Sequence, residues 1–351
     1  MFLALKEIKK EKLRSGLIIA MIVLISYLIF ILTSLALGLA QQNTDAIRSW
    51  NVDKVVLNAD ANTDMRQSFL SQQQVGKLTS KEAYIGETTV VAKAKGRKQL
   101  SAVFIGLKAD QFVAKNVQLT SGRRVRAGHE VVVDEAFKLA GYKLGSRVKL
   151  NADETKYTIV GFTKDAKLNI APVVYGQLST WRALRGMANG PVASAVVSRN
   201  ADYKNGRAGT KTYTTDQIIA KLPGYQAQNT TFGMMIGFLM VISLVIIAVF
   251  LYILTMQKLP NYAVLRAQGI PSRVLVGATV SQSFILVVSG LIIGSLLAAV
   301  TALVVPAAVP MAFDIPALSG VAVALLVMAM LGALVPIKSV LSVDPVSVIG
   351  G

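Results

Sequence analysis

Four long apolar runs without a single charged residue constrain this chain more than any other feature. They cover residues 15–40, 232–256, 274–305 and 317–337. At 1.5 Å per residue, the first run makes a helix about 39 Å long, enough to cross a hydrocarbon layer of about 30 Å with some tilt. A cleaved signal peptide is the alternative for this run, but the apolar region of a signal peptide has only about 7–15 residues. The sequence therefore predicts a membrane protein with four transmembrane helices.

Composition supports this class and narrows the chemistry. Of 351 residues, 53% are hydrophobic and 16% charged, whereas soluble domains carry about 25% charged residues. The chain has no cysteine and one histidine, His129, which excludes disulfides, thiolate ligands and a histidine metal cluster. The net charge of +18 comes without a nucleic-acid motif, so we expect attraction to anionic lipid or an anionic substrate and no nucleic-acid partner.

Residues 41–231 have the mixed composition of a folded domain. Valine-rich strand patterns alternate with short helical patterns, which predicts a large α+β domain inserted between the first two spans. The expected strands cover 54–57, 87–92, 100–105, 130–133, 147–150, 157–162 and 192–197. The expected helices cover 63–74, 136–140, 178–186 and 215–221, the last capped by Thr215 or Asp216.

The short flanks of the spans predict the orientation. Residues 1–14, expected to form a basic helix, the connector 257–273 and the tail 338–351 all contain Lys or Arg, whereas the loop 306–316 has neither. The positive-inside rule then places both termini and the connector in the cytoplasm of a cell with this protein in its plasma membrane. The inserted domain is expected outside, since long domains translocate largely regardless of their charge.

The connector is expected to contain a small amphipathic helix. Pro260 suits a first helical turn, and Gly269 ends the pattern. Tyr262, Leu265 and Arg266 have the spacing that places side chains on one helix face. This face could dock into a soluble partner, and the alternative is a helix lying flat on lipid headgroups.

The chain lacks the motifs of an energy source or a hydrolase. Its sequence contains no GxxxxGK[ST], GxSxG or HExxH pattern, and no span carries an ionisable residue in its middle. A carboxylate proton relay inside the membrane is therefore not expected. Uphill transport by this chain would need energy from another protein, and the connector is the natural contact.

Three segments resemble one family. They are LALKEIKKEKLRSGL before the first span, NYAVLRAQGIPSRVL after the second and VLSVDPVSVIGG after the fourth. Together they resemble permeases of the MacB/FtsX type of ABC transporter, which have one span, a large external domain and three more spans. The resemblance implies that the connector is a coupling helix inserting into a separate ATPase subunit, with Pro260, Tyr262, Leu265, Arg266 and Gly269 as coupling residues. Asn261 departs from the family pattern, in which many members carry an acid.

The first span and its flanks, ending in WNVDKVVLNAD, are most similar to the haem-exporting, HrtB-like branch of these permeases. This resemblance implies a homodimer with two copies of the ATPase, which removes haem from the membrane for detoxification. It also implies that the chain itself is no enzyme and has no intrinsic cofactor, and that ATP binds the partner subunit.

Haem needs an apolar slot, basic groups at one edge and an axial ligand, for which the sequence offers tyrosine and methionine. Gly233 and Gly237 flatten one face at the start of the second span, although a helix-packing motif explains this pair equally well. The pair Gly290 and Gly294 in the third span is expected to pack against the fourth. The candidate haem contacts are Tyr225, Phe232, Met234, Met235, Gly237, Thr33, Ser34 and Arg48.

Two other functions remain open at this level. One is an FtsX-like signal transmitter that moves no solute and acts on an external partner. Another is export of a peptide, lipid or macrolide by the same machinery. A membrane-anchored enzyme is disfavoured, because the acidic residues Asp134, Glu135, Asp153 and Glu154 lie among lysines and turn residues.

Overall fold

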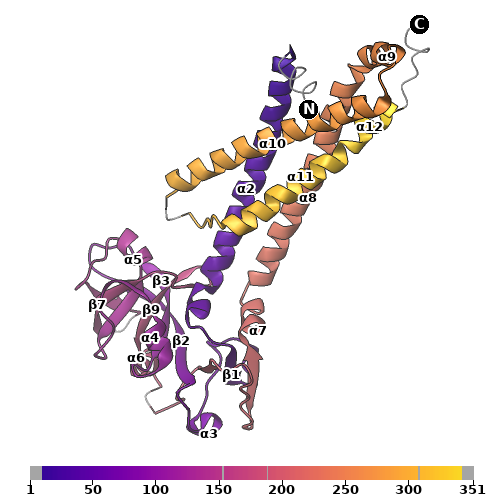
Figure 1. Ribbon diagram of the computed structural model, residues 1–351. Helices are drawn as coiled ribbons and strands as arrows, with labels where there is room; N and C mark the ends of the chain where they lie inside the picture. The colour runs from indigo at the N-terminus through magenta and orange to yellow at the C-terminus, as the bar shows by residue number, and fades with distance from the viewer. Residues whose placement is uncertain (1–9, 152–153, 188, 307–308, 342–351) are drawn as a thin grey trace. The chain divides into compact units, whose positions relative to one another are not determined.

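The computed structural model describes residues 10–151, 154–187, 189–306 and 309–341. The chain divides into two compact units (Figure 1). The membrane unit comprises Met1–Gly38 and Thr230–Gly351, and the inserted domain comprises Leu39–Asn229. Most of the predicted basic N-terminal helix and of the predicted tail lies outside the described residues.

In the part of the chain that the structure describes, four helical segments are long and apolar enough to cross a membrane, which confirms the predicted fold class together with the domain between the first two of them. Within the described residues, the spans and the connector are built from α2 (Lys12–Ser49), α8 (Tyr225–Met256), α9 (Leu259–Ala267), α10 (Ser272–Val304), α11 (Ile315–Gly332) and α12 (Leu334–Leu341). The fourth span joins α11 and α12, and it breaks at Ala333. Pro336 accounts for the break, because proline has no N–H for the carbonyl group four residues earlier and its ring collides with that carbonyl.

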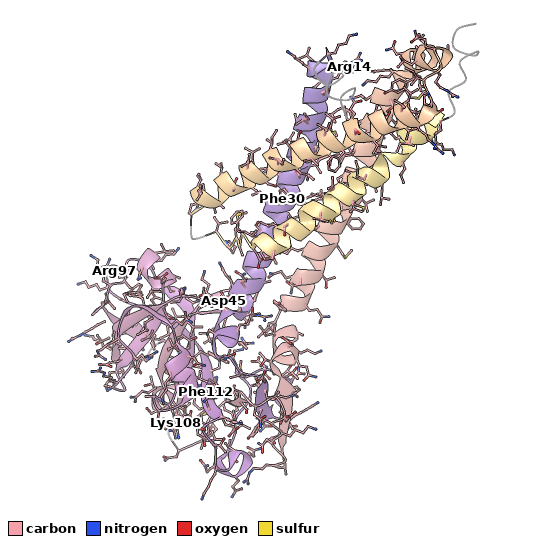
Figure 2. The ribbon with its side chains drawn as sticks, viewed as in Figure 1. Arg14, Phe30, Asp45, Arg97, Lys108 and Phe112 are labelled. Carbon is pink, nitrogen blue, oxygen red and sulfur yellow. The ribbon has the colours of Figure 1, made fainter. Side chains whose placement is uncertain are left out.

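Small residues of α10 receive side chains of α2. A Cβ on Gly290 would lie 2.5 Å from Ile22 Cγ2, and one on Gly294 would collide with Ser26. The sequence-based expectation that this pair packs against the fourth span is therefore wrong, since the partner is the first span. Ile22 belongs to the buried core of the membrane unit, which also contains Phe30, labelled in Figure 2.

The loop between the third and fourth spans packs against α2. The Ala312 N–H donates to the Ser34 carbonyl at 2.9 Å, and a Cβ on Gly38 would collide with the Pro310 carbonyl. Asp314 then caps α11, since its Oδ1 accepts from the Ala317 N–H at 3.0 Å. Glycine at position 38 thus permits a backbone approach that any other residue would block.

The inserted domain is built on one 11-stranded mixed sheet with the order β11-β1-β10-β2-β3-β9-β5-β7-β4, in which β6 pairs with β2 and β7, and β8 pairs with β9. The strands are β1 (Lys54–Asn58), β2 (Glu82–Lys93), β3 (Leu100–Leu107), β4 (Leu119–Gly122), β5 (Glu130–Asp134), β6 (Arg147–Leu150), β7 (Lys156–Thr163), β8 (Lys167–Leu168), β9 (Ala171–Gln177), β10 (Ala195–Ser198) and β11 (Thr210–Thr214).

Alternating strand residues supply two separate cores, one on each face of this sheet. On β3, Val103 and Ile105 join the first core and Phe104 joins the second, as expected for side chains that alternate between faces. The C-terminal end of α2 reaches the first core through Ala46 and Ile47, and Trp50 follows directly after the helix. Short helices complete both cores, namely α3 (Gln72–Val75), α4 (Phe112–Asn116), α5 (Ala136–Leu139), α6 (Leu178–Leu184) and α7 (Thr215–Ala220).

Two local expectations are wrong. The segment 63–74 is not one helix, because Asn62 and Thr63 adopt positive φ angles of 45° and 65° and only Gln72–Val75 is helical. The cap of α7 is Thr214 rather than Thr215 or Asp216, since the Thr214 hydroxyl accepts from the Gln217 backbone in a capping box.

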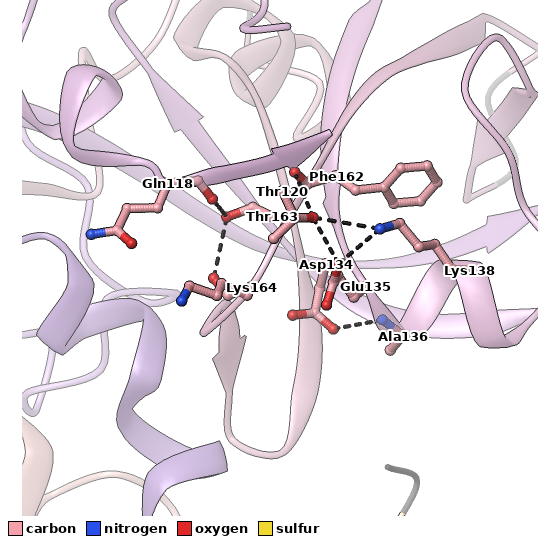
Figure 3. A network of polar contacts seen from close by, with 9 residues as sticks. All are labelled: Gln118, Thr120, Asp134, Glu135, Ala136, Lys138, Phe162, Thr163 and Lys164. Carbon is pink, nitrogen blue, oxygen red and sulfur yellow. Dashed lines mark hydrogen bonds and ion pairs between the residues drawn. The ribbon is translucent and has the colours of Figure 1, made fainter. Parts of the chain in front are cut away.

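Polar residues of the inserted domain mostly serve its own structure. Arg97 lies in the exposed turn between β2 and β3 (Figure 2). In Figure 3, Glu135 accepts from Lys138 and from Thr120, both at 2.7 Å, and Asp134 accepts from the Ala136 N–H at 2.9 Å. Asp153 lies outside the described residues. The described part of this acidic group thus holds turns and helix ends together.

Candidate functional site

The connector between α8 and α10 folds as the helix α9. Pro260 occupies its first turn, where the missing N–H has no intrahelical acceptor to satisfy. Gly269 follows the helix with a φ of 89°, a conformation that glycine adopts without strain. Both residues therefore fix where the helix begins and ends.

The helix turns its aromatic residue inward. Tyr262 is 2% exposed and packs in a small cluster with Leu275 of α10 and Val340 of α12. Leu265 is partly buried against the same cluster, and Arg266 is also half-buried. The predicted docking face thus packs largely against the membrane unit itself.

The opposite face of α9 is open. Val264 is 48% exposed, and its neighbours on this face are the exposed residues Pro260, Asn261, Ala267 and Gln268. A valine on the exposed face of a helix leaves an apolar patch with polar residues beside it. Such a patch suits contact with a protein surface or with lipid headgroups.

A buried lysine ties α9 to α10. Lys258, directly before α9, donates from Nζ to Gln282 Oε1 at 2.9 Å, and both side chains are buried. A buried ammonium group is costly unless it is hydrogen-bonded. The pair therefore anchors the start of the connector helix to the third span.

The N-terminal half of α8 presents an apolar surface. Phe238 is 62% exposed, Met234 56% and Met235 45%, and α8 is the least buried of the four spans. Gly233 and Gly237 have no atom of the described residues within 4 Å of an added Cβ. The flat face predicted from these glycines is thus not covered by another helix of the described chain.

Thr33 and Ser34 of α2 lie in a different environment. Both are buried, and the backbone of Ser34 is bonded to Ala312 in the loop between the third and fourth spans. Among the described residues, neither hydroxyl has a hydrogen-bond partner. They do not share the exposed surface that Phe232, Met234, Met235 and Gly237 form on α8.

Arg48 and Tyr225 belong to the inserted domain. Arg48 lines an open depression of about 410 Å³ together with a second basic residue, Lys54. Asp53 and Asp216 line it too, so the depression also carries negative charge. Tyr225 is partly buried against the first core of the sheet.

Sequence reasoning did not find Lys258 and Gln282 as a pair, and it did not single out Val264 or Phe238. A lysine at the end of one apolar run and a glutamine inside the next are signals of a polar contact between the two spans. The outward position of Val264 has no such signal, because helical periodicity groups residues by face without showing which face is covered.

Comparison with known proteins finds similarity to membrane permeases. Residues 233–345 match the family model described as FtsX-like permease C-terminal. The chain is 25% identical over 356 residues to a protein of Staphylococcus epidermidis named "Putative hemin transport system permease protein HrtB", covering 100% of this chain and 99% of the relative. A protein of Staphylococcus haemolyticus with the same name is 24% identical over 354 residues, with the same coverage.

Two solved structures were also matched. The periplasmic region of MacB from Actinobacillus actinomycetemcomitans is 16% identical with a TM-score of 0.35, covering 48% of this chain and 92% of that one. The extracellular domain of the transporter YknZ from Gram-positive bacteria is 14% identical with a TM-score of 0.31, covering 52% and 94%. Residues 233–345 are therefore similar to the C-terminal domain of FtsX-like permeases, and the chain along its whole length is similar to proteins named as hemin transport permeases.

Proposed function

We propose that this chain is the membrane subunit of an ABC-type efflux pump that exports haem from the membrane for detoxification. The observation that carries the proposal is the similarity along the entire chain to two proteins that bear the name of a hemin transport permease. This similarity includes the inserted domain as well as the spans, so it exceeds the match to the permease family alone.

A separate ATPase supplies the energy, since the sequence has no nucleotide-binding motif. The exposed face of α9 around Val264 is the contact that we assign to this ATPase. The packing of Tyr262 against α10 and α12 and the bond from Lys258 to Gln282 support a rigid link from the docked helix to the spans. Tyr262, Leu265 and Arg266 then act as supports of α9, with Pro260 and Gly269 setting its ends.

The working pump is a homodimer with two ATPase copies, with both termini and α9 in the cytoplasm and the inserted domain outside. The charge difference between the short flanks supports this orientation. A second copy of the chain or a bound ligand is what we expect on the open part of α8, because Gly233 and Gly237 allow close approach there.

Haem binds, in this proposal, to the exposed start of α8. Phe232 and Gly237 would face the flat macrocycle, and Met234 or Met235 would offer a thioether to the iron. Tyr225 and Arg48 remain candidates in the inserted domain. We rank Thr33 and Ser34 below the other candidates. Both side chains are buried, and the loop at Ala312 would have to move before they could touch a ligand.

The test is the haem tolerance of cells and the spectrum of the purified complex. Deleting this chain while keeping its ATPase should sensitise cells to haem, and the purified complex should show a haem absorption band. Replacing Met234 and Met235 with leucine should change this band, while Met311→Leu, outside α8, should leave it as it is. Unchanged tolerance together with an absent band would favour an FtsX-like signal transmitter.

A further inference from the structure

A cavity of about 340 Å³ opens on one face of the sheet in the inserted domain. Most of its wall consists of short or apolar side chains of β2, β3 and β9, including Val91, Val103 and Ala171. Four longer polar side chains also reach it, namely Glu87, Arg66, Asn151 and Asn169. The cavity thus has the apolar wall and few polar groups that are typical of a small-molecule site.

Glu87 is the unusual member of this set. It is 3% exposed, and no hydrogen bond to its carboxylate oxygens is found in the described part of the chain. Burial of a carboxylate without donors is strongly unfavourable. Accordingly, burial raises the pKa of Glu87 to about 7, and the negative charge of Asp64 raises it further while Arg66 lowers it.

The backbone holds Glu87 in this position from the other side of the strand. Its N–H donates to Ser194 Oγ at 2.8 Å and its carbonyl accepts from Trp181 Nε1 at 2.9 Å. A Cβ on either Gly86 or Gly106 would collide with Trp181, so the indole lies directly on the sheet. The N–H and the carbonyl group of Glu87 are thus both hydrogen-bonded, which fixes the strand at this point. The side chain of Glu87 lines the cavity and is shielded from solvent.

The nearest positive charge is already engaged. The Arg66 guanidinium donates to Asp64 Oδ1 from Nε at 3.0 Å and to Asp64 Oδ2 from Nη2 at 2.8 Å. A bidentate pair of this kind satisfies both groups. The charges of Arg66 and Asp64 therefore nearly cancel. At a pH above the pKa of Glu87, its carboxylate gives the cavity one uncompensated negative charge.

A second acceptor lines the same cavity. Asn169 Oδ1 is buried and has no hydrogen-bond partner among the described residues. Among the described residues, Asn151 makes no hydrogen bond to Asn169. The Oδ1 atom of Asn151 accepts from the Val91 N–H at 2.9 Å. No hydrogen bond from either asparagine to Glu87 is found among the described residues, so the donors that the Glu87 carboxylate needs would come from an occupant.

From this geometry we infer that the cavity binds a small primary ammonium group, which donates to the Glu87 carboxylate. Val103 and Ala171 would cover the hydrocarbon part of the ligand. A metal ion is a poorer occupant, because no group of three or more His, Asp or Glu in the described residues could hold one. This site is distinct from the proposed haem contacts, since none of those residues lines the cavity.

The experiment is a calorimetric titration of the full chain in nanodiscs of phosphatidylcholine, which carries no net charge to attract amines. The probe is 1,5-diaminopentane, and 1,5-pentanediol is its neutral isostere. At pH 8 we expect saturable binding of the diamine and none of the diol. Equal binding of both, or of neither, would overturn the inference.

Variants and pH supply two further readouts. Glu87→Gln keeps the side-chain volume and should weaken diamine binding at least tenfold, whereas Glu135→Gln, a carboxylate in another part of the domain, should not change it. From pH 8 to pH 6 the affinity of the unmodified chain should fall about tenfold, because a proton competes at Glu87 while the amine stays charged. Binding that is unaffected by both changes would contradict the role of Glu87. If Nα-acetyl-lysine methylamide competes with the diamine, the natural source of the ammonium group is a peptide lysine. If it does not compete, the natural ligand is a free amine.

Discussion

Lys258 Nζ lies 2.9 Å from Gln282 Oε1, a hydrogen bond between two buried side chains at the junction of the connector helix α9 and the third span. The bond joins residues that are 24 positions apart. It fixes the start of α9 against α10, and the packing of Tyr262 on Leu275 and Val340 fixes the rest. A displacement of α9 should therefore be transmitted to the third and fourth spans.

Replacing Lys258 with methionine tests this link. The change keeps most of the side-chain volume but leaves Gln282 Oε1 without its donor, which should lower the stability of the membrane unit by about 1–3 kcal/mol. ATP turnover by the assembled pump should become insensitive to substrate. Thermal unfolding and ATPase assays check both effects, with the exposed Lys338→Met as the matched control. Substrate-stimulated turnover at the level of the unmodified chain would remove Lys258 from the coupling path.

The exposed face of α9 makes a second prediction. Val264→Asp places a charge in the proposed ATPase contact and should weaken assembly with the ATPase at least tenfold, or by about 1.4 kcal/mol. The permease itself should remain folded, because Val264 is half exposed. Gln257→Asp adds the same charge at an exposed residue before α9 that lies outside this face, and it should be tolerated. Co-purification at matched expression decides, and equal losses from both variants would indicate a general charge effect.

The packing of α2 against α10 makes a third prediction. Gly290→Ala adds a Cβ that collides with Ile22 and should cost about 1–3 kcal/mol. Gly277→Ala lies in the same helix, but apart from the helix's own backbone an added Cβ has no atom of the described residues within 4 Å. This variant should lie within about 0.5 kcal/mol of the unmodified chain. Thermal unfolding in one detergent compares the two. Similar midpoints for both variants would mean that α2 does not pack there.

Glu87 makes the stability of the inserted domain depend on pH. Its pKa is raised from 4.5 to about 7 in the folded chain by burial, so the folded state holds more protons than the unfolded state between these values. The free energy of unfolding should then fall as pH rises from about 4.5 to about 7, and level off above. Glu87→Gln cannot ionise, so it should be more stable than the unmodified chain at pH 8 by roughly 3 kcal/mol and nearly equal at pH 4. A constant difference across this range would mean that Glu87 is not the titrating group.

The four spans were predictable because length and lack of charge determine them without knowledge of any partner. Strand β9 was missed because Pro172 and Gly176 interrupt its pattern. The structure explains the glycine, since a Cβ on Gly176 would collide with the ring of Phe104. The helix expected over 63–74 does not form as one element. Instead, the Asp64 carboxylate accepts from the Arg66 backbone and side chain in a turn.

The connector helix was predictable in position, but which of its faces is covered was not. Helical spacing correctly grouped Tyr262 with Leu265, yet whether that face points to a partner or inward depends on α10 and α12. Similarly, Met234 and Ser34 were both plausible from their places in the sequence. Only the packing of the loop at Ala312 on Ser34 shows that one is covered and the other open.

The central claim is that this chain uses the energy of a separate ATPase to move haem. The most direct measurement is the ATP turnover of the permease–ATPase complex in nanodiscs with added haem, a peptide mixture or a macrolide. The account predicts that haem stimulates turnover, that the other compounds do not, and that Val264→Asp abolishes the stimulation. Stimulation by peptide or macrolide but not by haem would contradict it.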